Sequence, residues 1–279
     1  LTRPTVKEVK KMSSEFLINQ IKDAVGVETN VFYTGTTSKE TVKALVKKNF
    51  IISKNLRDSN SPYVWDKKLS EENTIYFHND KKAVQSQIYI IIDGQVMNEK
   101  DRHMSNIFNK YFGGMSGLIF QEIREFRSLA YSARGGYRKP FFFDKTGRYE
   151  GYMGTQADKT IDAIETYMNL LSEMPEKANR MAGIKSGMLQ SLTSSRSNFR
   201  GIGNTLRTWR KQGFKEDPKV MQKEVYENAE FEDLIKFYKE YIQDKPYTIA
   251  IVGNKEKIDF NKLSSYGNII ELKKEDIFN

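Results

Sequence analysis

The sequence predicts an α+β fold, in which a mainly antiparallel sheet carries helices packed on one face. Short apolar segments typical of strands gather between residues 74 and 155. An almost wholly helical pattern follows from Lys159 to Tyr241, and one further strand pattern returns at Tyr247–Val252. Strands grouped early, helices grouped late and one returning strand are typical of two packed layers.

The first part of the chain has the pattern helix, strand, turn, helix. Apolar residues at helical spacing from Thr5 to Val25 predict a helix that ends near Gly26. Thr29–Tyr33 has the pattern of a strand, and Lys39–Phe50 that of another helix. The far end of the chain repeats this order, with Gly35 aligned on Gly253, which suggests tandem homologous domains.

This repeat predicts the domain organisation. Residues 1–55 are expected to be the tail of a preceding homologous α+β domain, and residues 74–279 a complete one. Residues 56–73, which are rich in Ser, Asn and Asp around Pro62, are expected to be a linker. The chain begins at Leu1 rather than at a methionine, so we interpret it as an excised segment of a longer protein.

The second domain opens with two predicted strands, Thr74–His78 and Gln85–Asp93. The second is apolar at consecutive positions, so we expect it to be central or covered on both faces. A helix over Asn98–Phe112 follows. Strands at Leu129–Arg138 and Arg148–Thr155 are expected to form an antiparallel hairpin that crosses the site, and a last strand, Asn268–Leu272, to add an edge.

The functional interpretation depends on the stretch from Tyr111 to Tyr137. It has the pattern of a helix end, a break at Gly113 and Gly114, and a second helix opened by Met115 and Ser116. Phe120, Ile123 and Phe126 recur at three-residue spacing, which predicts that they share one buried helical face.

Three runs in this stretch, Gly-Gly-Met-Ser, Phe-Gln-Glu-Ile-Arg-Glu and Arg-Ser-Leu-Ala-Tyr-Ser, resemble the pitrilysin/insulinase family of zinc metallopeptidases, the inverzincins. In that family the equivalent glycine-rich turn, helix and strand lie in the half that does not bind zinc. An Arg and a Tyr seven positions apart reach the active site, and Arg124 and Tyr131 have this spacing. The resemblance implies that Tyr131 is a transition-state donor and Arg124 a substrate anchor. It also implies that substrate backbone approaches Gly113, Gly114, Met115 and Ser116.

The chemistry of such a pair has a physical reason. When water attacks a peptide carbonyl, negative charge grows on the oxygen, and a fixed donor aimed at that oxygen lowers the barrier. A phenol keeps its proton at neutral pH and can donate it in a hydrogen bond. A guanidinium offers several donors in a rigid fork, which suits it to holding substrate carbonyls or a carboxylate.

Metal binding is not expected in this chain. It has no cysteine, and its two histidines, His78 and His103, lack the spacing and the glutamate of an H-x-x-E-H zinc motif. The resemblance implies that the zinc and its general-base glutamate belong to a missing N-terminal half. The expected partners are therefore that zinc-binding half, or a partner subunit that supplies it, and an unfolded peptide substrate.

The composition leaves other functions open. The net charge of +9 is compatible with nucleic acid, an anionic surface or an acidic substrate, although lysines alternate with acidic residues along the chain. A basic aromatic stretch either lines a cavity or its rim, or binds nucleic acid, and we favour the cavity because no nucleic-acid-binding fold is recognisable. Its residues are Arg196, Phe199, Arg200, Arg207, Trp209 and Arg210.

The function we expect is that of the non-zinc-binding half of a peptidase, inactive by itself. The alternatives are a catalytically inactive scaffold, a peptide-binding subunit of such a complex, or a nucleic-acid-binding module. No apolar run approaches the length of about 18 residues needed to cross a membrane, and the absence of cysteine is compatible with cytoplasm or periplasm.

Overall fold

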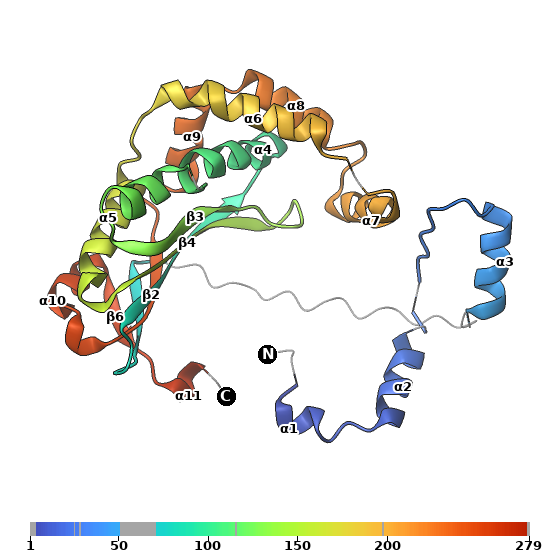
Figure 1. Cartoon of the computed structure of the whole chain (residues 1–279), viewed down its shortest axis with the longest axis horizontal. Coiled ribbons are helices and arrows are strands. Elements are labelled where there is room, and N and C mark those ends of the chain that lie inside the picture. Colours follow the sequence, from blue (N-terminus) through green and yellow to red (C-terminus); the bar gives the residue numbers. More distant parts are fainter. Residues whose placement is uncertain are drawn as a thin grey trace. The chain divides into compact units, whose positions relative to one another are not determined.

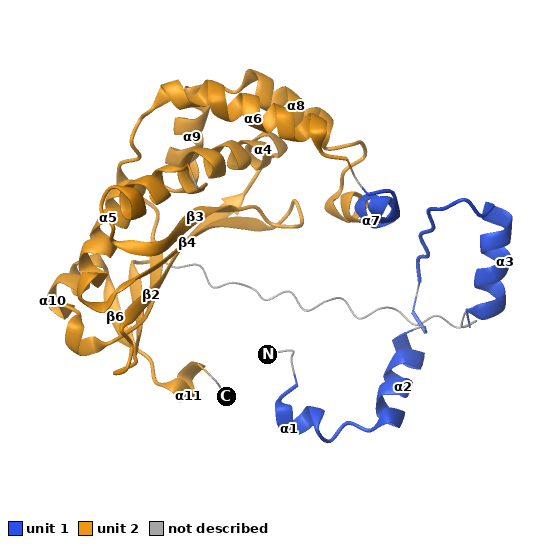
Figure 2. Cartoon of the chain, in the orientation of Figure 1, with its two compact units in different colours: residues 1–67, 197–207 blue, residues 68–196, 208–279 orange. Residues whose placement is uncertain are grey.

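The computed structural model describes residues 4–24, 26–27, 29–50, 71–114, 116–196 and 198–277. The chain divides into two compact units, coloured separately in Figure 2. Unit 1 comprises residues 1–67 and 197–207, and unit 2 comprises residues 68–196 and 208–279. Residues 56–70 of the predicted linker lie outside the described residues.

Unit 1 contains short helices and no sheet among its described residues. Its helices are α1 (Val6–Val9), α2 (Ser14–Ala24) and α3 (Lys39–Asn49), followed much later in the chain by the 3-10 turn η5 (Phe199–Gly201) and the first part of α7 (Ile202–Gln212). The single helix predicted over Thr5–Val25 is two helices. Ser13 explains the break, because its Oγ accepts a hydrogen bond from the Phe16 N–H (3.1 Å), the arrangement that starts a new helix.

The strand predicted at Thr29–Tyr33 is wrong, since these described residues form no strand. A strand requires a neighbouring segment to which its backbone can hydrogen bond. The described strands all belong to the six-stranded sheet of unit 2, and residues 29–33 are not part of it. The apolar pattern of the segment was therefore not sufficient to specify a strand.

Unit 2 is built on this sheet, with the strand order β3-β4-β2-β5-β1-β6. The β3–β4, β4–β2 and β2–β5 pairs are antiparallel, whereas β1 runs parallel to both β5 and β6. The bounds are β1 Thr74–Asn79, β2 Gln85–Val96, β3 Ala130–Arg138, β4 Thr146–Gln156, β5 Tyr247–Gly253 and β6 Asn268–Glu271. The predicted mainly antiparallel sheet, its β3–β4 hairpin and its last edge strand are confirmed.

Helices cover one side of this sheet, as Figure 1 shows for α4, α5 and α9. The α-helices are α4 (Glu99–Phe108), α5 (Thr160–Ser172), α6 (Met181–Ser194), α8 (Lys219–Asn228), α9 (Phe231–Tyr241), α10 (Phe260–Leu263) and α11 (Lys274–Ile277). Two π-helical segments are η1 (Asn109–Gly113) and η2 (Phe120–Glu125). Short 3-10 turns are η3 (Ala157–Lys159), η4 (Ala178–Arg180), η6 (Lys255–Lys257) and η7 (Ser264–Tyr266).

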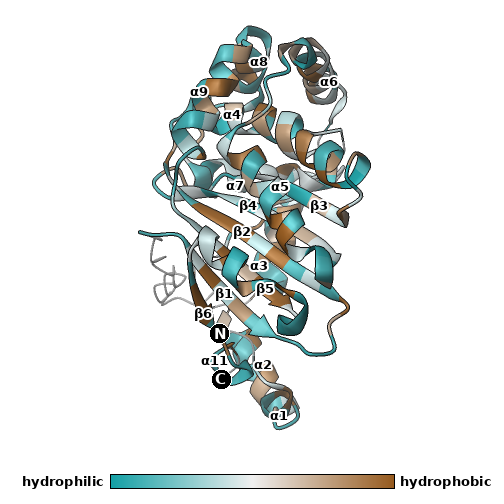
Figure 3. Ribbon diagram, turned by 90° about the vertical axis from the view of Figure 1, so that its left-hand side faces the viewer, coloured by the Kyte–Doolittle hydropathy of each residue, from teal (hydrophilic) through white to brown (hydrophobic). Residues whose placement is uncertain are grey.

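The core lies between the sheet and these helices. Ile88, Ile90 and Ile92 of β2 are at most 2% exposed, and each such buried side chain stabilises the fold by about 1.5–3 kcal/mol. Phe237 of α9 packs against Phe108 of α4, and the ring centres are 5.5 Å apart. Figure 3 shows the apolar colouring of β1, β2 and β5 inside unit 2. This arrangement confirms the predicted α+β class with helices on one face.

Strand β2 is central, as predicted, but its two faces differ. The isoleucines above are buried, whereas Tyr89 on the opposite face is 48% exposed and Ile91 is half-buried. The helical layer covers only one face of this sheet, so the alternation of side chains along the strand places these two residues on the other face.

The central stretch has the predicted helix, break and second helix, in an unusual geometry. Segment η2 is π-helical, and the Phe126 N–H donates to the Gln121 carbonyl, five residues earlier (2.9 Å). A π-helix has more residues per turn than an α-helix, so spacing by three does not keep residues on one face. Ile123 is fully buried but Phe126 is 67% exposed, and the predicted common buried face is wrong for Phe126.

Candidate functional site

Tyr131 lies at a bulge in β3. Ala130 is paired with Thr155 of β4, but the next pair is Ser132 with Gly154, so Tyr131 is an extra residue without a partner. Strict alternation from the buried Ala133 would turn Tyr131 towards the core. The bulge instead leaves its side chain 83% exposed. A bulge can re-aim a side chain in this way, and bulges occur often beside active sites.

Arg124 of η2 lies next to Tyr131. Its guanidinium carbon is 5.3 Å from the centre of the Tyr131 ring and 4.7 Å from that of Phe120. These distances are typical of a cation–π contact. The Arg124 Nε also lies 3.7 Å from the carboxylate of its chain neighbour Glu125, in a partly exposed ion pair. The structure therefore brings the two predicted catalytic residues together.

A tight turn between η2 and β3 holds the two residues in this relation. The Ser128 N–H donates to the Arg124 carbonyl (3.1 Å), and the Leu129 N–H donates to the Ile123 carbonyl (2.9 Å). Ser128 has a φ of 51°, a left-handed conformation that costs a residue with a side chain about 1–2 kcal/mol. The Leu129 carbonyl accepts a hydrogen bond from the Thr155 Oγ1 (2.5 Å), which ties the turn to β4.

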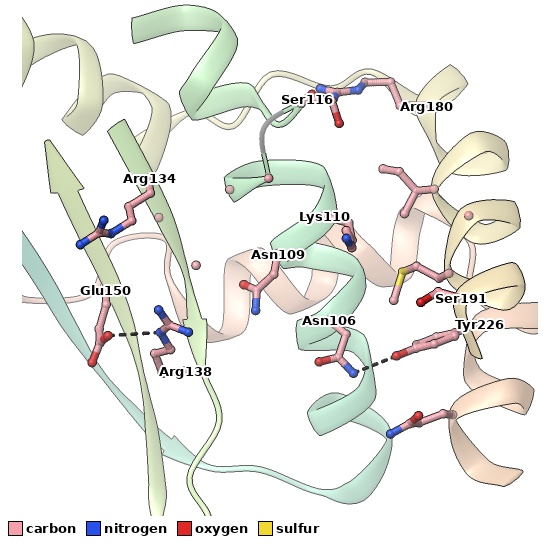
Figure 4. A pocket seen from close by; sticks show the side chains of 18 of the residues that line it. Asn106, Asn109, Lys110, Ser116, Arg134, Arg138, Glu150, Arg180, Ser191 and Tyr226 are labelled. Atoms are coloured by element: carbon pink, nitrogen blue, oxygen red, sulfur yellow. Dashed lines mark hydrogen bonds and ion pairs between the residues drawn. The ribbon is translucent and has the colours of Figure 1, made fainter. Parts of the chain in front are cut away.

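A large cavity of about 1360 Å³ lies elsewhere in unit 2. Residues of β2, β3 and β4 form one wall, α4 and η1 form a second, and α6 and α8 form a third. Figure 4 shows Arg134, Arg138 and Glu150 on the strands, with Asn106, Asn109 and Lys110 across from them on the helix. The volume exceeds the range of about 300–1,000 Å³ usual for small-molecule pockets.

Three of the predicted substrate-binding residues, Gly113, Gly114 and Ser116, line this cavity. Met115 lies outside the described residues. Arg124 and Tyr131 are not among the lining residues, so the predicted site residues fall into two groups.

The cavity is rich in arginine, but not in the arginines that the sequence suggested. Arg134, Arg138, Arg148 and Arg180 line it, whereas none of Arg196, Arg200, Arg207 and Arg210 does. The predicted role of the basic aromatic stretch, to line a cavity or its rim, therefore stays a prediction. The sequence did contain a signal for this wall in the predicted hairpin. Positions 134, 138, 148 and 150 are all charged, and residues two or four apart in a strand share a face.

The two histidines lie in different surroundings. The His78 Nδ1 lies 2.9 Å from the Leu272 carbonyl oxygen, within hydrogen-bonding distance. His103 is buried in α4, where burial lowers its pKa to about 4 and the nearby Lys139 and Arg102 add to the effect. The described residues contain no group of three or more His, Cys, Asp or Glu side chains that could hold a metal ion. No helix in the described part of the chain is long and apolar enough to cross a membrane.

A family model described as the peptidase M16 inactive domain matches residues 28–182, more than half of the chain. The chain belongs to this family. The match confirms the resemblance to the pitrilysin/insulinase peptidases seen in the central stretch. No curated protein matches the chain.

Solved structures share the fold of this M16 domain at low identity. A protease from Helicobacter pylori is 16% identical with a TM-score of 0.65, and the match covers 89% of this chain and 61% of that one. The ferredoxin protease FusC, solved in complex with Arabidopsis ferredoxin, is 11% identical with a TM-score of 0.64, over 91% and 28% of the two chains. The periplasmic protease PqqL from Escherichia coli is 16% identical with a TM-score of 0.56, over 79% and 25%. The M16 domain described here thus spans less than two thirds of the length of each of these proteins.

Proposed function

We propose that this chain is the non-zinc-binding half of a pitrilysin-like metallopeptidase. Its M16 inactive-domain fold and the longer proteases that share this fold support the proposal. A partner half, in the same polypeptide or in another subunit, would hold zinc, which activates water and polarises the peptide carbonyl when bound. Unfolded peptide is the proposed substrate.

The observation that carries the proposal is the position of Tyr131. An exposed phenol at a bulge, with a guanidinium 5.3 Å from the centre of its ring, is available to groups outside its own chain. Tyr131 would donate a hydrogen bond from its hydroxyl to the carbonyl oxygen as negative charge develops there, and would keep its proton. Arg124 would hold a substrate carbonyl or carboxylate beside it.

The test uses the chain assembled with its zinc-binding half and measures peptide hydrolysis. Tyr131→Phe removes one hydroxyl and should lower kcat by about 10²- to 10³-fold, as loss of an oxyanion donor does elsewhere. Tyr76→Phe removes a hydroxyl from β1, four strands away in the sheet, and should leave kcat unchanged. An unchanged kcat for Tyr131→Phe would remove this residue from the mechanism.

Arg124 is tested in the same assay. Arg124→Gln should raise KM more than it lowers kcat, because the proposed role is to hold the substrate. Arg124→Lys keeps the charge but loses the planar fork and should recover only part of the affinity. A KM equal to that of the parent enzyme in both variants would exclude a substrate anchor.

The isolated chain provides a separate check. It should bind no stoichiometric zinc and cleave no peptide, because the proposed zinc ligands belong to the partner half. Metal analysis that finds one tightly bound zinc per chain would contradict the division of roles.

A further inference from the structure

The cavity in unit 2 carries a large excess of positive charge. Among the described residues that line it, one side chain is acidic, that of Glu150 on β4. The same lining contains six basic side chains: Lys110, Arg134, Arg138, Arg148, Arg180 and Lys219.

The Glu150 carboxylate already forms ion pairs with two of these cations. The Arg138 Nε donates to its Oε2 (3.2 Å), and the Arg148 Nε donates to its Oε1 (2.5 Å). One carboxylate therefore balances one of two arginines, and it has little capacity left for the rest of the cavity.

Three of the other four cations contact neutral groups. Arg134 lies over the Tyr152 ring, 4.4 Å from its centre, and the Lys219 Nζ donates to the Ser195 carbonyl (2.8 Å). The Arg180 Nη2 donates to the Ser116 carbonyl, while its Nη1 is buried without an acceptor among the described residues. A guanidinium has five N–H donors and an ammonium three, so these side chains keep donors for a ligand.

The walls leave room for a polypeptide between these cations. Gly183 and Gly187 stand one turn apart on the α6 wall, and no atom lies within 4 Å of the position of a β-carbon on either. On the strand wall, the rings of Tyr89 and Tyr152 lie 5.0 Å apart and add apolar surface. Figure 4 shows Arg134 on a strand of one wall and Lys110 on the helix of another, so more than one wall of the cavity carries a cation.

We propose that this cavity selects acidic segments of unfolded polypeptide, whose Asp and Glu carboxylates are bound by Arg134, Lys110, Arg180 and Lys219. The proposal specifies a substrate class, and it rests on the proposed function of the chain as a peptidase half. A polypeptide fits better than nucleic acid, because binding of single strands relies on exposed aromatic rings on which bases stack. Of the two rings on the strand wall, Arg134 covers that of Tyr152, which leaves Tyr89 as a single stacking position there.

The experiment measures binding of labelled peptides to the chain by fluorescence anisotropy, without zinc and without hydrolysis. Three unstructured peptides of equal length carry Asp and Glu, the matching Asn and Gln, or Lys. The acidic peptide should bind at least about tenfold more tightly than the amide peptide at low salt, and added salt should reduce this advantage. Equal binding of the acidic and amide peptides would overturn the proposal.

Two charge variants should act in opposite directions. Arg134→Gln removes a cation and should weaken binding of the acidic peptide by about threefold to fivefold. Glu150→Gln releases two arginines and should strengthen it by a similar factor. The control Lys262→Gln, at an exposed position of α10, removes one positive charge, as Arg134→Gln does, and should leave the affinity unchanged. Thermal midpoints of all three variants check that they are folded.

Other outcomes would contradict the proposal or indicate a different ligand for the cavity. Equal effects of Arg134→Gln and Lys262→Gln would show a general effect of net charge rather than binding in the cavity. A single-stranded oligonucleotide that displaces the acidic peptide and binds more tightly would indicate a nucleic-acid site instead. Failure of the binding test leaves the role of Tyr131 intact, because that role is measured by hydrolysis of neutral peptides.

Discussion

A β-carbon on Gly113 would lie 1.6 Å from the carbonyl oxygen of Gly135. The end of η1 therefore packs directly against the backbone of β3, and this contact places the glycine turn beside the strand that carries Tyr131. The neighbouring Gly114 is less constrained, since a β-carbon there would lie 3.4 Å from its nearest neighbour, the Lys110 carbonyl oxygen. The two adjacent glycines thus have different structural roles.

This difference gives a matched pair of variants. Gly113→Ala should lower the free energy of unfolding by about 1–3 kcal/mol or more, because backbone on both sides must shift to make room. Gly114→Ala should change it by at most about 0.5 kcal/mol. Urea denaturation of both variants measures the effect. Equal stabilities would show that η1 and β3 separate easily.

The buried pair of Tyr149 and Tyr167 gives a second prediction. Their hydroxyl oxygens are 2.7 Å apart, and the Tyr167 hydroxyl donates to the Arg134 carbonyl (2.9 Å). Tyr167→Phe leaves the Tyr149 hydroxyl buried without its partner and should cost about 1–3 kcal/mol. Tyr149→Phe preserves the bond to Arg134 and should cost about 1 kcal/mol. A larger loss of stability in Tyr149→Phe than in Tyr167→Phe would contradict this hydrogen-bond order.

The stability of the fold should depend on pH through His103. Burial lowers the pKa of this imidazole to about 4 in the folded chain, whereas its usual value is about 6.5. The unfolded state therefore binds more protons between these values, so stability is greatest above pH 6.5 and falls as the pH drops towards 4. Between pH 7 and pH 5 the free energy of unfolding should decrease by about 2 kcal/mol through this group.

Variants separate this contribution from other titrations. His103→Leu should remove that part of the pH dependence, because an apolar side chain fills the buried position without a proton to bind. His78→Asn, at a half-buried position of β1, should retain the pH dependence due to His103. Urea denaturation at several pH values measures both. If His103→Leu shows the same loss between pH 7 and pH 5 as the parent chain, His103 is not the group responsible.

The local pattern of the sequence was sufficient for most elements of unit 2. The helical pattern predicted from Lys159 ends at Tyr241, which is the last residue of α9, and the apolar run in Gln85–Asp93 predicted that β2 is central. These predictions succeed because apolar patterns indicate directly which elements are buried. The same rule fails at Thr29–Tyr33, which pairs with none of the described strands, and at Phe126, where a π-helical segment changes the period.

The candidate site was predicted only in part. The Arg124–Tyr131 spacing led to a pair that is close in space, although its catalytic role stays a prediction. The cavity was not predicted, because its cations come from β3, β4, η1, η4 and α8, which are far apart in the sequence.

The sequence alone determined the α+β class, the order of strands and helices along the chain of unit 2, and the family resemblance of its central stretch. Only the tertiary structure decided that β1 runs parallel to β5, that a bulge exposes Tyr131, and that basic residues meet in one cavity. The physical reason is that periodicity and capping depend on neighbours a few residues away. Strand pairing, register and the walls of a cavity depend instead on segments that meet only when the whole chain has folded.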